Sequence, residues 1–402
     1  MKLKLPKQFN KKPSFKTVIV VVFALVCSLS AIYYGLLLNN RLSLSHKIQT
    51  DLETKNEQLM SEIITLKARI AELENEDTRK TNTALNDRLK VMDDAYKKSV
   101  SVYESLNDLK QISKNTTALD TLYAKSIGIL STSDYASASA QLVDLQKQID
   151  AEKQKVTAAT ALAVSAPVNN TAPGSGYSRQ AVQSDVGTFT VSMVAADMGS
   201  TKIIVDTASD GDCGNNCPVL PLATYVSRNG AYAGVNGSYF CPASYPTCAG
   251  KTNTFDLLVM NKNKTYFNSG NNVYSNNPVV VFQSGSMRFI GSGSGWGRDT
   301  GVDGVLMNYP LLVSGGNVSF GGDDDPKKGS KGNRSFVSNR GNIGYIGVVH
   351  SATVAEAAHV LKTLGMENAL NLDDGGSTAL WSGGYKVGPG RDLPNVILFV
   401  RK

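Results

Sequence analysis

Histidine and cysteine are scarce in this sequence, with three histidines and five cysteines among 402 residues. The sequence contains no Cys-x2-Cys pair and no histidine near the C-terminal cysteines, which disfavours a zinc site. It also lacks the spacing of oxygen ligands that defines an EF-hand. Net charge is low outside the N-terminus, because residues 1–16 hold six lysines and no acid, leaving 7 − 6 = +1 for the remainder. We therefore expect no nucleic-acid partner.

Residues 17–38 form a stretch of 22 residues without a charge. A helix of that length reaches about 33 Å, enough to cross a bilayer. The basic residues 1–16 predict a cytoplasmic tail, which places residues 39–402 outside the cytoplasm. A cleaved signal peptide is the alternative, but the apolar run exceeds the usual 7–15 residues of such a segment. We interpret it as a single-pass membrane anchor.

The four cysteines that follow the span are Cys213, Cys217, Cys241 and Cys248. An even number of cysteines in an oxidising compartment favours two disulfides. The spacing does not fix their connectivity. We expect the sequential pairs 213–217 and 241–248.

Residues 40–78 carry a heptad pattern, with leucines seven apart at positions 52, 59, 66 and 73 and Asn56 at the other seam position. This pattern predicts a coiled coil that joins two copies as a parallel homodimer. The alternative is a single amphipathic helix that packs on residues 85–150.

Residues 79–156 read as a polar helical stalk with no recognisable chemistry, broken near Ser131–Asp134. Apolar residues recur at helical spacing, which predicts one buried stripe. The stripe comprises Leu85, Leu89, Met92, Tyr96, Val100 and Tyr103. Residues 157–178 are rich in Ala, Ser, Thr, Asn and Pro, as a flexible linker is.

The pattern changes to β-strands in residues 179–402. Residues 277–290, 305–320 and 334–349 predict hairpins, each with a glycine-containing turn. One helix is expected after Thr353, because Thr353 and Glu356 have the spacing of a capping box. The sequence therefore predicts an α+β domain with antiparallel hairpins and few helices.

The segment Ala-Leu-Asn-Leu-Asp-Asp-Gly-Gly-Ser-Thr at residues 369–378 places two acids at the end of a predicted buried strand. Asp373 and Asp374 are followed by Gly375, Gly376 and Ser377, a loop whose backbone a ligand can approach. Acids beside bare N–H groups suit acid–base chemistry on an anionic or sugar substrate. An acidic turn without function is the alternative reading.

Four segments, in order, resemble the phosphodiester glycosidase family, over residues 187–402. They are residues 233–240 (Ala-Gly-Val-Asn-Gly-Ser-Tyr-Phe), 333–335 (Asn-Arg-Ser), 369–378 and 391–398 (Arg-Asp-Leu-Pro-Asn-Val-Ile-Leu). The resemblance implies hydrolysis of a sugar-1-phosphodiester. The family has glycine at the position of Asp374 and other residue types at 336–338, where this chain has Phe-Val-Ser.

The resemblance and the residue chemistry together assign provisional roles. Asp373 is expected to transfer protons or hold substrate, and His350, at a strand end, is a candidate general acid. We carry Asp374 as a further catalytic candidate, although its charge would repel a phosphodiester unless a cation or Arg334 compensates for it. Arg334 suits a phosphate clamp. The other substrate-binding candidates are Asn236, Gly237, Tyr239, Gly375, Gly376 and Ser377.

The sequence thus predicts a membrane-anchored extracytoplasmic hydrolase acting on a carbohydrate or sugar-phosphate substrate, such as an envelope glycopolymer. No cofactor is assigned, no metal-ligand set is identified, and a need for calcium or magnesium stays open. The alternative is a non-catalytic glycan-binding or scaffolding module presented on a coiled-coil stalk.

Overall fold

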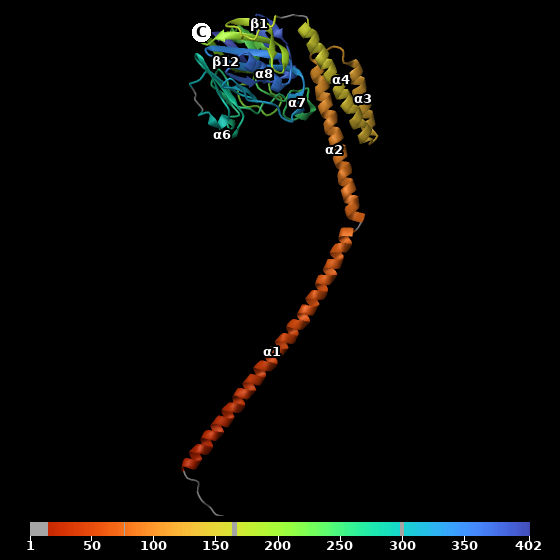
Figure 1. Ribbon diagram of the computed structural model, residues 1–402, viewed down its shortest axis with the longest axis vertical. Coiled ribbons are helices and arrows are strands. Elements are labelled where there is room, and N and C mark those ends of the chain that lie inside the picture. Colours follow the sequence, from red (N-terminus) through yellow and green to blue (C-terminus); the bar gives the residue numbers. More distant parts are fainter. Residues whose placement is uncertain (1–14, 76, 163–166, 298–300) are drawn as a thin grey trace, which may run out of the picture. The chain divides into compact units, whose positions relative to one another are not determined.

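The computed structural model describes residues 15–75, 77–162, 167–297 and 301–402. They divide into two units, the first ending at Arg88 and the second comprising Leu89–Lys402. In the first unit, α1 (Phe15–Asn75) is one continuous helix (Figure 1). It includes a segment long and apolar enough to cross a membrane, within Val18–Leu73. The heptad leucines are exposed in the single chain, so the predicted coiled coil stays a prediction.

Three helices open the second unit and lie side by side (Figure 1). They are α2 (Asp77–Lys110, which begins in the first unit), α3 (Thr117–Ser131) and α4 (Tyr135–Leu162). The predicted break before α4 is present, and the Asp134 carboxylate accepts a hydrogen bond from the Ser137 amide. The sequence did not indicate the break between α2 and α3.

The face of α2 that the bundle buries differs from the predicted stripe. Leu85, Leu89 and Tyr96 are exposed, whereas Ala95 and Leu106 are fully buried. The buried residues of α2 are offset by one position from the predicted ones, since Ala95 is buried and Tyr96 is exposed. An offset of one residue corresponds to a rotation of about 100° around the helix. Met92, Val100 and Tyr103 of the predicted stripe are half-buried, so the stripe prediction is wrong by one position in register.

The sheet-rich domain confirms the predicted α+β class. Its strands, among the described residues, form three antiparallel sheets. The first has the order β1 (Gly176–Ser184), β2 (Gly187–Asp197), β13 (Ile343–Ala352), β12 (Gly332–Arg340), β14 (Asn368–Asn371), β10 (Leu311–Ser314), β11 (Asn317–Val318). The second is β16 (Tyr385–Val387), β15 (Leu380–Ser382), β4 (Ala233–Asn236), β17 (Asn395–Arg401), β3 (Thr201–Thr207). The third is β6 (Tyr266–Phe267), β5 (Val259–Met260), β9 (Gly304–Met307), β7 (Val279–Gln283), β8 (Ser286–Ile290).

Short helices complete the domain: α5 (Leu222–Asn229), α6 (Asn271–Tyr274), α7 (Pro326–Gly329), α8 (Val354–Thr363), and the 3-10 turns η1 (Pro246–Cys248), η2 (Gly293–Gly295) and η3 (Gly375–Ser377). One apolar core includes side chains of all three sheets, and a second packs α8 against the first sheet. The capping box of α8 is present, with reciprocal bonds between Thr353 and Glu356. Gly365, with φ of 76°, follows the helix.

Two of the predicted hairpins are confirmed as β7–β8 and β12–β13. The third is confirmed only in its second half, because β10 and β11 pair around Gly315 and Gly316. Val305 instead belongs to β9, which pairs with β5 and β7 in another sheet. Secondary structure also enters the predicted linker from both sides, since α4 continues to Leu162 and β1 begins at Gly176.

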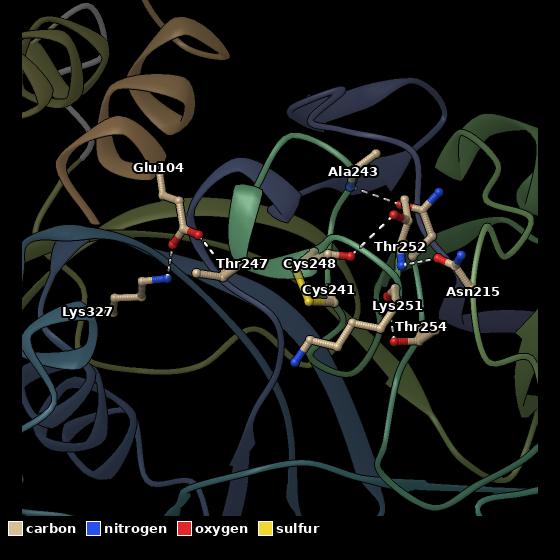
Figure 2. The surroundings of a disulfide bond; sticks show 11 residues. Glu104, Asn215, Cys241, Ala243, Thr247, Cys248, Lys251, Thr252, Thr254 and Lys327 are labelled. Carbon is tan, nitrogen blue, oxygen red and sulfur yellow. Dashed lines mark hydrogen bonds and ion pairs between the residues drawn. A yellow bond between two sulfur atoms is a disulfide. The ribbon is translucent and has the colours of Figure 1, made fainter. Parts of the chain in front are cut away.

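Both predicted disulfides are present, joining Cys213 to Cys217 and Cys241 to Cys248. The second closes a loop that contains η1 and ends beside the candidate site. Figure 2 shows this disulfide with Thr247 and its neighbours.

Candidate functional site

A pocket of about 530 Å³ opens in the second unit, with the predicted acidic segment in its lining. β14 leads into this segment, and the chain then turns through η3. Gly375 has φ of 61°, a conformation that glycine adopts without strain. The pocket lining includes Asp373, Asp374, Gly375 and Gly376, whereas Ser377 is buried outside it. The structure thus brings most of the predicted loop to one cavity.

Asp373 is held by its own backbone at the base of the pocket. Its amide donates to the Gly237 carbonyl at 2.9 Å, and its carbonyl accepts from Asn236 Nδ2 at 2.6 Å. One carboxylate oxygen accepts from the Asp374 amide at 2.9 Å. Burial raises the pKa of Asp373 to about 7, against the opposing influence of Ser377 and Arg391. This carboxyl therefore exchanges a proton near neutral pH.

Asp374 has a different environment, although it is the adjacent residue. Its Oδ1 accepts from the Ser335 amide at 3.0 Å, and its Oδ2 accepts from Asn371 Nδ2 at 2.9 Å and from Arg334 Nη1 at 3.2 Å. Burial raises its pKa, and Arg334 is the largest opposing influence. These bonds tie the carboxylate of Asp374 to the protein, which suits a structural role better than a catalytic one.

Arg334 is engaged in the same way. Its Nε donates to the Ala352 carbonyl at 3.0 Å, and Nη2 donates to the carbonyls of Lys327, at 3.0 Å, and Ser330. Its Nη1 pairs with Asp374, and only 6% of the side chain is exposed. The predicted phosphate clamp stays a prediction, and a substrate phosphate would have to compete with these bonds.

Asn236 and Gly237 lie beneath the pocket rather than in its lining. Asn236 is fully buried, and its Oδ1 accepts from Ser335 Oγ at 2.8 Å and from the Ala379 amide at 3.1 Å. A Cβ at Gly237 would lie 1.9 Å from Asn395 Oδ1, so only glycine fits there. Both residues position the Asp373 backbone, whereas the sequence predicted substrate contacts.

Tyr239 does line the pocket. Its hydroxyl accepts from Asn371 Nδ2 at 2.7 Å, and its ring lies 5.1 Å from that of Tyr309. Burial raises the pKa of Tyr239 well above its usual value. The side chain is therefore a neutral aromatic surface against which a sugar ring can pack.

His350 does not line the pocket, but it contacts Asn333, which does. Its Nε2 is 2.9 Å from Ser192 Oγ, and its Nδ1 is 3.0 Å from the Oδ1 of Asn333, which itself lines the pocket. Burial, followed by the Arg179 charge, lowers the pKa of His350 to about 3. A neutral imidazole in this place orients Asn333, so the general-acid role predicted for His350 has no support from its position.

Several residues that line the pocket were not among the predicted site residues, Arg391 among them. Arg391 donates from its backbone to the Gly376 carbonyl at 2.9 Å, and its guanidinium packs against Gly376, where a Cβ would lie 2.4 Å from Nη2. Arg391 begins the segment at residues 391–398 that resembles the glycosidase family, and this resemblance is the feature of the sequence that could have indicated its place in the pocket.

The pocket lining contains charges of both signs. The cationic lining residues are Lys98, Lys153, Lys327, Lys328, Lys331, Arg334 and Arg391, and the anionic ones are Asp108, Asp150, Asp325, Asp373 and Asp374.

The part of the chain that the structure describes contains no group of three or more His, Cys, Asp and Glu side chains arranged to hold a metal ion.

Part of the C-terminal domain is similar to a known protein family. Residues 229–400 match the profile of the phosphodiester glycosidase family, which confirms the resemblance found in the sequence. No curated protein matches the chain.

Two similar solved structures have low identity to this chain. A hypothetical protein from Synechocystis is 15% identical, with 56% of this chain and 62% of that one covered and a TM-score of 0.39. The catalytic domain of zebrafish N-acetylglucosamine-1-phosphodiester alpha-N-acetylglucosaminidase, auto-inhibited by its pro-peptide, is 13% identical. That match covers 59% of this chain and 87% of that one, with a TM-score of 0.43.

Proposed function

We propose that the C-terminal domain hydrolyses a sugar-1-phosphodiester, with Asp373 as the proton-transferring residue. The observation that carries this proposal is a buried carboxyl, with its pKa raised to about 7, in a pocket whose lining includes more cationic than anionic side chains. A general acid or base works best when its pKa lies near the working pH. The match of residues 229–400 to the phosphodiester glycosidase family supplies the reaction class.

One carboxyl is sufficient for the proposed reaction. Water attacks the anomeric carbon, Asp373 takes a proton from that water, and the bond between the anomeric carbon and the phosphate oxygen breaks. A phosphomonoester leaves. Since phosphate monoesters ionise near pH 6, this group departs as an anion and needs less protonation than an alkoxide. Cations in the pocket, Arg391 and Lys327 among them, stabilise that anion.

The test is turnover of a panel of sugar-1-phosphodiesters by the full chain in detergent. We expect Asp373→Asn to lower kcat roughly 10²- to 10⁴-fold and Arg334→Ala to reduce turnover through the loss of Asp374 positioning. Asp210→Asn is the matched control, because Asp210 is an exposed carboxyl of the same domain. Full activity of Asp373→Asn would refute the assignment. Absence of turnover by folded wild-type protein, with and without calcium or magnesium, would refute the enzyme proposal for this panel.

A glycan-binding module is the second candidate function. The observation that favours it is the engagement of Asp374 and Arg334 with each other, which removes both from a substrate. This candidate predicts that sugar phosphates bind without turnover and that Asp373→Asn leaves their affinity unchanged. Isothermal titration of the wild type and of this variant separates the two functions.

We also propose that the chain is anchored through residues 17–38, with the C-terminal domain outside the cytoplasm, and that it pairs through residues 40–78. The support is the apolar stretch of α1 and its exposed leucines, such as Leu59 and Leu66. Cross-linking of the full chain should yield a dimer that Leu59→Lys with Leu66→Lys abolishes and Ser61→Lys preserves. A monomer in the wild type would refute the pairing.

The orientation of the anchored chain has a separate test, which is protease protection of the C-terminal domain in sealed vesicles.

A further inference from the structure

The candidate pocket has a second wall, which comes from outside the segment that matches the glycosidase family. Residues of α2 and α4 line this wall, among them Ser105, Asp108 and Lys153. The family match begins only at residue 229. The sequence indicated a stalk here, so the position of these side chains in the pocket is a finding of the structure.

Polar contacts attach α2 to the loop that the Cys241–Cys248 disulfide closes. Glu104 accepts a hydrogen bond from Thr247 Oγ1 and pairs with Lys327 at 3.1 Å, as Figure 2 shows. One turn further along α2, Asn107 Nδ2 donates to the Ser244 carbonyl at 3.0 Å. The contacts fix the end of α2 beside the pocket.

Asp108 is the α2 residue whose side chain lies beside Arg391 and the acidic segment. Its Oδ1 accepts a hydrogen bond from Arg391 Nη2, and its Oδ2 accepts one from the Tyr245 hydroxyl at 2.7 Å. A Cβ built at Gly375 would lie 3.8 Å from Asp108 Oδ2, so this carboxylate stands beside the acidic segment. Its side chain is 20% exposed and that of Arg391 is 13% exposed.

Arg391 connects this pair to Asp373. The guanidinium packs against Gly376, three positions after Asp373. Its charge favours ionisation of the Asp373 carboxyl, opposing burial. A carboxylate that holds Arg391 in place and balances its charge therefore governs how strongly Arg391 acts on Asp373.

We propose that Asp108 is a positioning residue of the active site, acting through Arg391, and that the helices α2 and α4 belong to that site. Asp108 fixes the guanidinium against the Gly375–Gly376 turn and offsets its charge. Asp373 thereby keeps a proton affinity suited to neutral pH. The inference rests on the proposed role of Asp373 as the proton-transferring residue.

Two substitutions in the full chain shift the titration of Asp373 in opposite directions. Asp108→Asn keeps the size of the side chain and removes its charge, so the unbalanced guanidinium should move the Asp373 limb of the pH–rate profile to lower pH by about half a unit or more. Arg391→Gln removes the cation and should move it to higher pH. Asp108→Glu should restore much of the wild-type profile. Asp144→Asn, on an α4 side chain that is 73% exposed, is the matched control and should leave the profile unchanged.

We expect Asp108→Asn to lower kcat/KM about tenfold. An unmoved limb in Asp108→Asn, together with a shifted limb in Arg391→Gln, would overturn the inference. A rise in turnover in Asp108→Asn would also overturn it, because Asp108 would then block the site. If the wild type turns over no substrate, carbon-13 shifts of the labelled aspartate carboxyls measure the same titration. The positioning inference can thus fail or hold separately from the proposed function.

Discussion

The two sides of the pocket differ in how their charged groups are held. On the domain side, Asp374 and Arg334 form an ion pair whose side chains are less than 10% exposed. On the helical side, Glu104 is equally buried, but its partner Lys327 is 60% exposed. The Asp374–Arg334 pair is therefore part of the folded core, whereas the Glu104–Lys327 pair attaches the helical side at the rim. Substitutions on the first should affect stability and chemistry together, and those on the second should affect the site with little loss of stability.

The largest effect should come from Asp373 on the domain side. General acid–base catalysis contributes roughly 10²- to 10⁴-fold to rates, so Asp373→Asn should lower kcat by that factor while the chain stays folded. Steady-state kinetics beside a melting curve measures both quantities. If a helical-side change such as Asp108→Asn cost more activity than Asp373→Asn, the comparison between the two sides would be reversed.

The next effect concerns Arg334. Removing one partner of a buried ion pair leaves an uncompensated charge and typically costs about 3–5 kcal/mol. Arg334→Met should destabilise the domain by that amount, because Asp374 would lose its cation. Addition of Asp374→Asn should recover most of the loss, as urea unfolding of the single and double variants would show. A fully stable Arg334→Met would mean that the pair contributes nothing to the core.

The stability of the domain should fall as pH rises between about 4 and 7 through the contribution of Asp373. Its folded pKa of about 7 lies above the ordinary value of 3.8, so the folded state binds the proton more tightly than the unfolded chain. The contribution is fully present below the unfolded pKa and is lost as pH rises through the folded pKa, by up to about 4 kcal/mol. Melting temperatures at pH 5 and 8 measure it. Asp373→Asn should flatten the dependence, and an unchanged slope would show that Asp373 is not the group responsible.

The smallest effect should come from Glu104. Glu104→Gln keeps an acceptor for Thr247 and loses the charge that pairs with the exposed Lys327, so it should cost about 1 kcal/mol. The Asp373 limb of the pH profile should not move. Glu72→Gln removes an exposed partner of Arg69 in α1 and should be neutral by the same melting assay. A cost for Glu104→Gln as large as that of Arg334→Met would remove the distinction between core and rim.

Local signals account for the parts of the fold that could be predicted. The capping box at Thr353, the turn at Gly315–Gly316 and the short cysteine spacings each act over a few residues. The order of strands in the sheets could not be predicted, because β2 pairs with β13 from a distant part of the sequence. The face of α2 was misjudged because apolar spacing alone does not show which stripe finds a partner.

The candidate site divides in the same way. Asp373 and the glycines after it follow one another in the sequence, so the motif revealed them together. Asp108 and Arg391 meet only in the folded chain, and Asp108 is an ordinary polar residue of a helix when seen in the sequence. The internal bonds of Asn236 and Arg334 were equally hidden, because a sequence does not show whether a polar group faces a ligand or the protein.

The position of β17 in the second sheet has a consequence for biosynthesis. This strand lies between β4 and β3, although both of them are made much earlier. Until residues 395–401 have left the ribosome, β3 and β4 have no partner between them, and their backbone edges stay open. The sheet that supports the base of the pocket through Asn236 thus closes only after the whole acidic segment has been synthesised. A nascent chain arrested before Asn395 would expose two strand edges, which is the state in which chaperones and proteases recognise it.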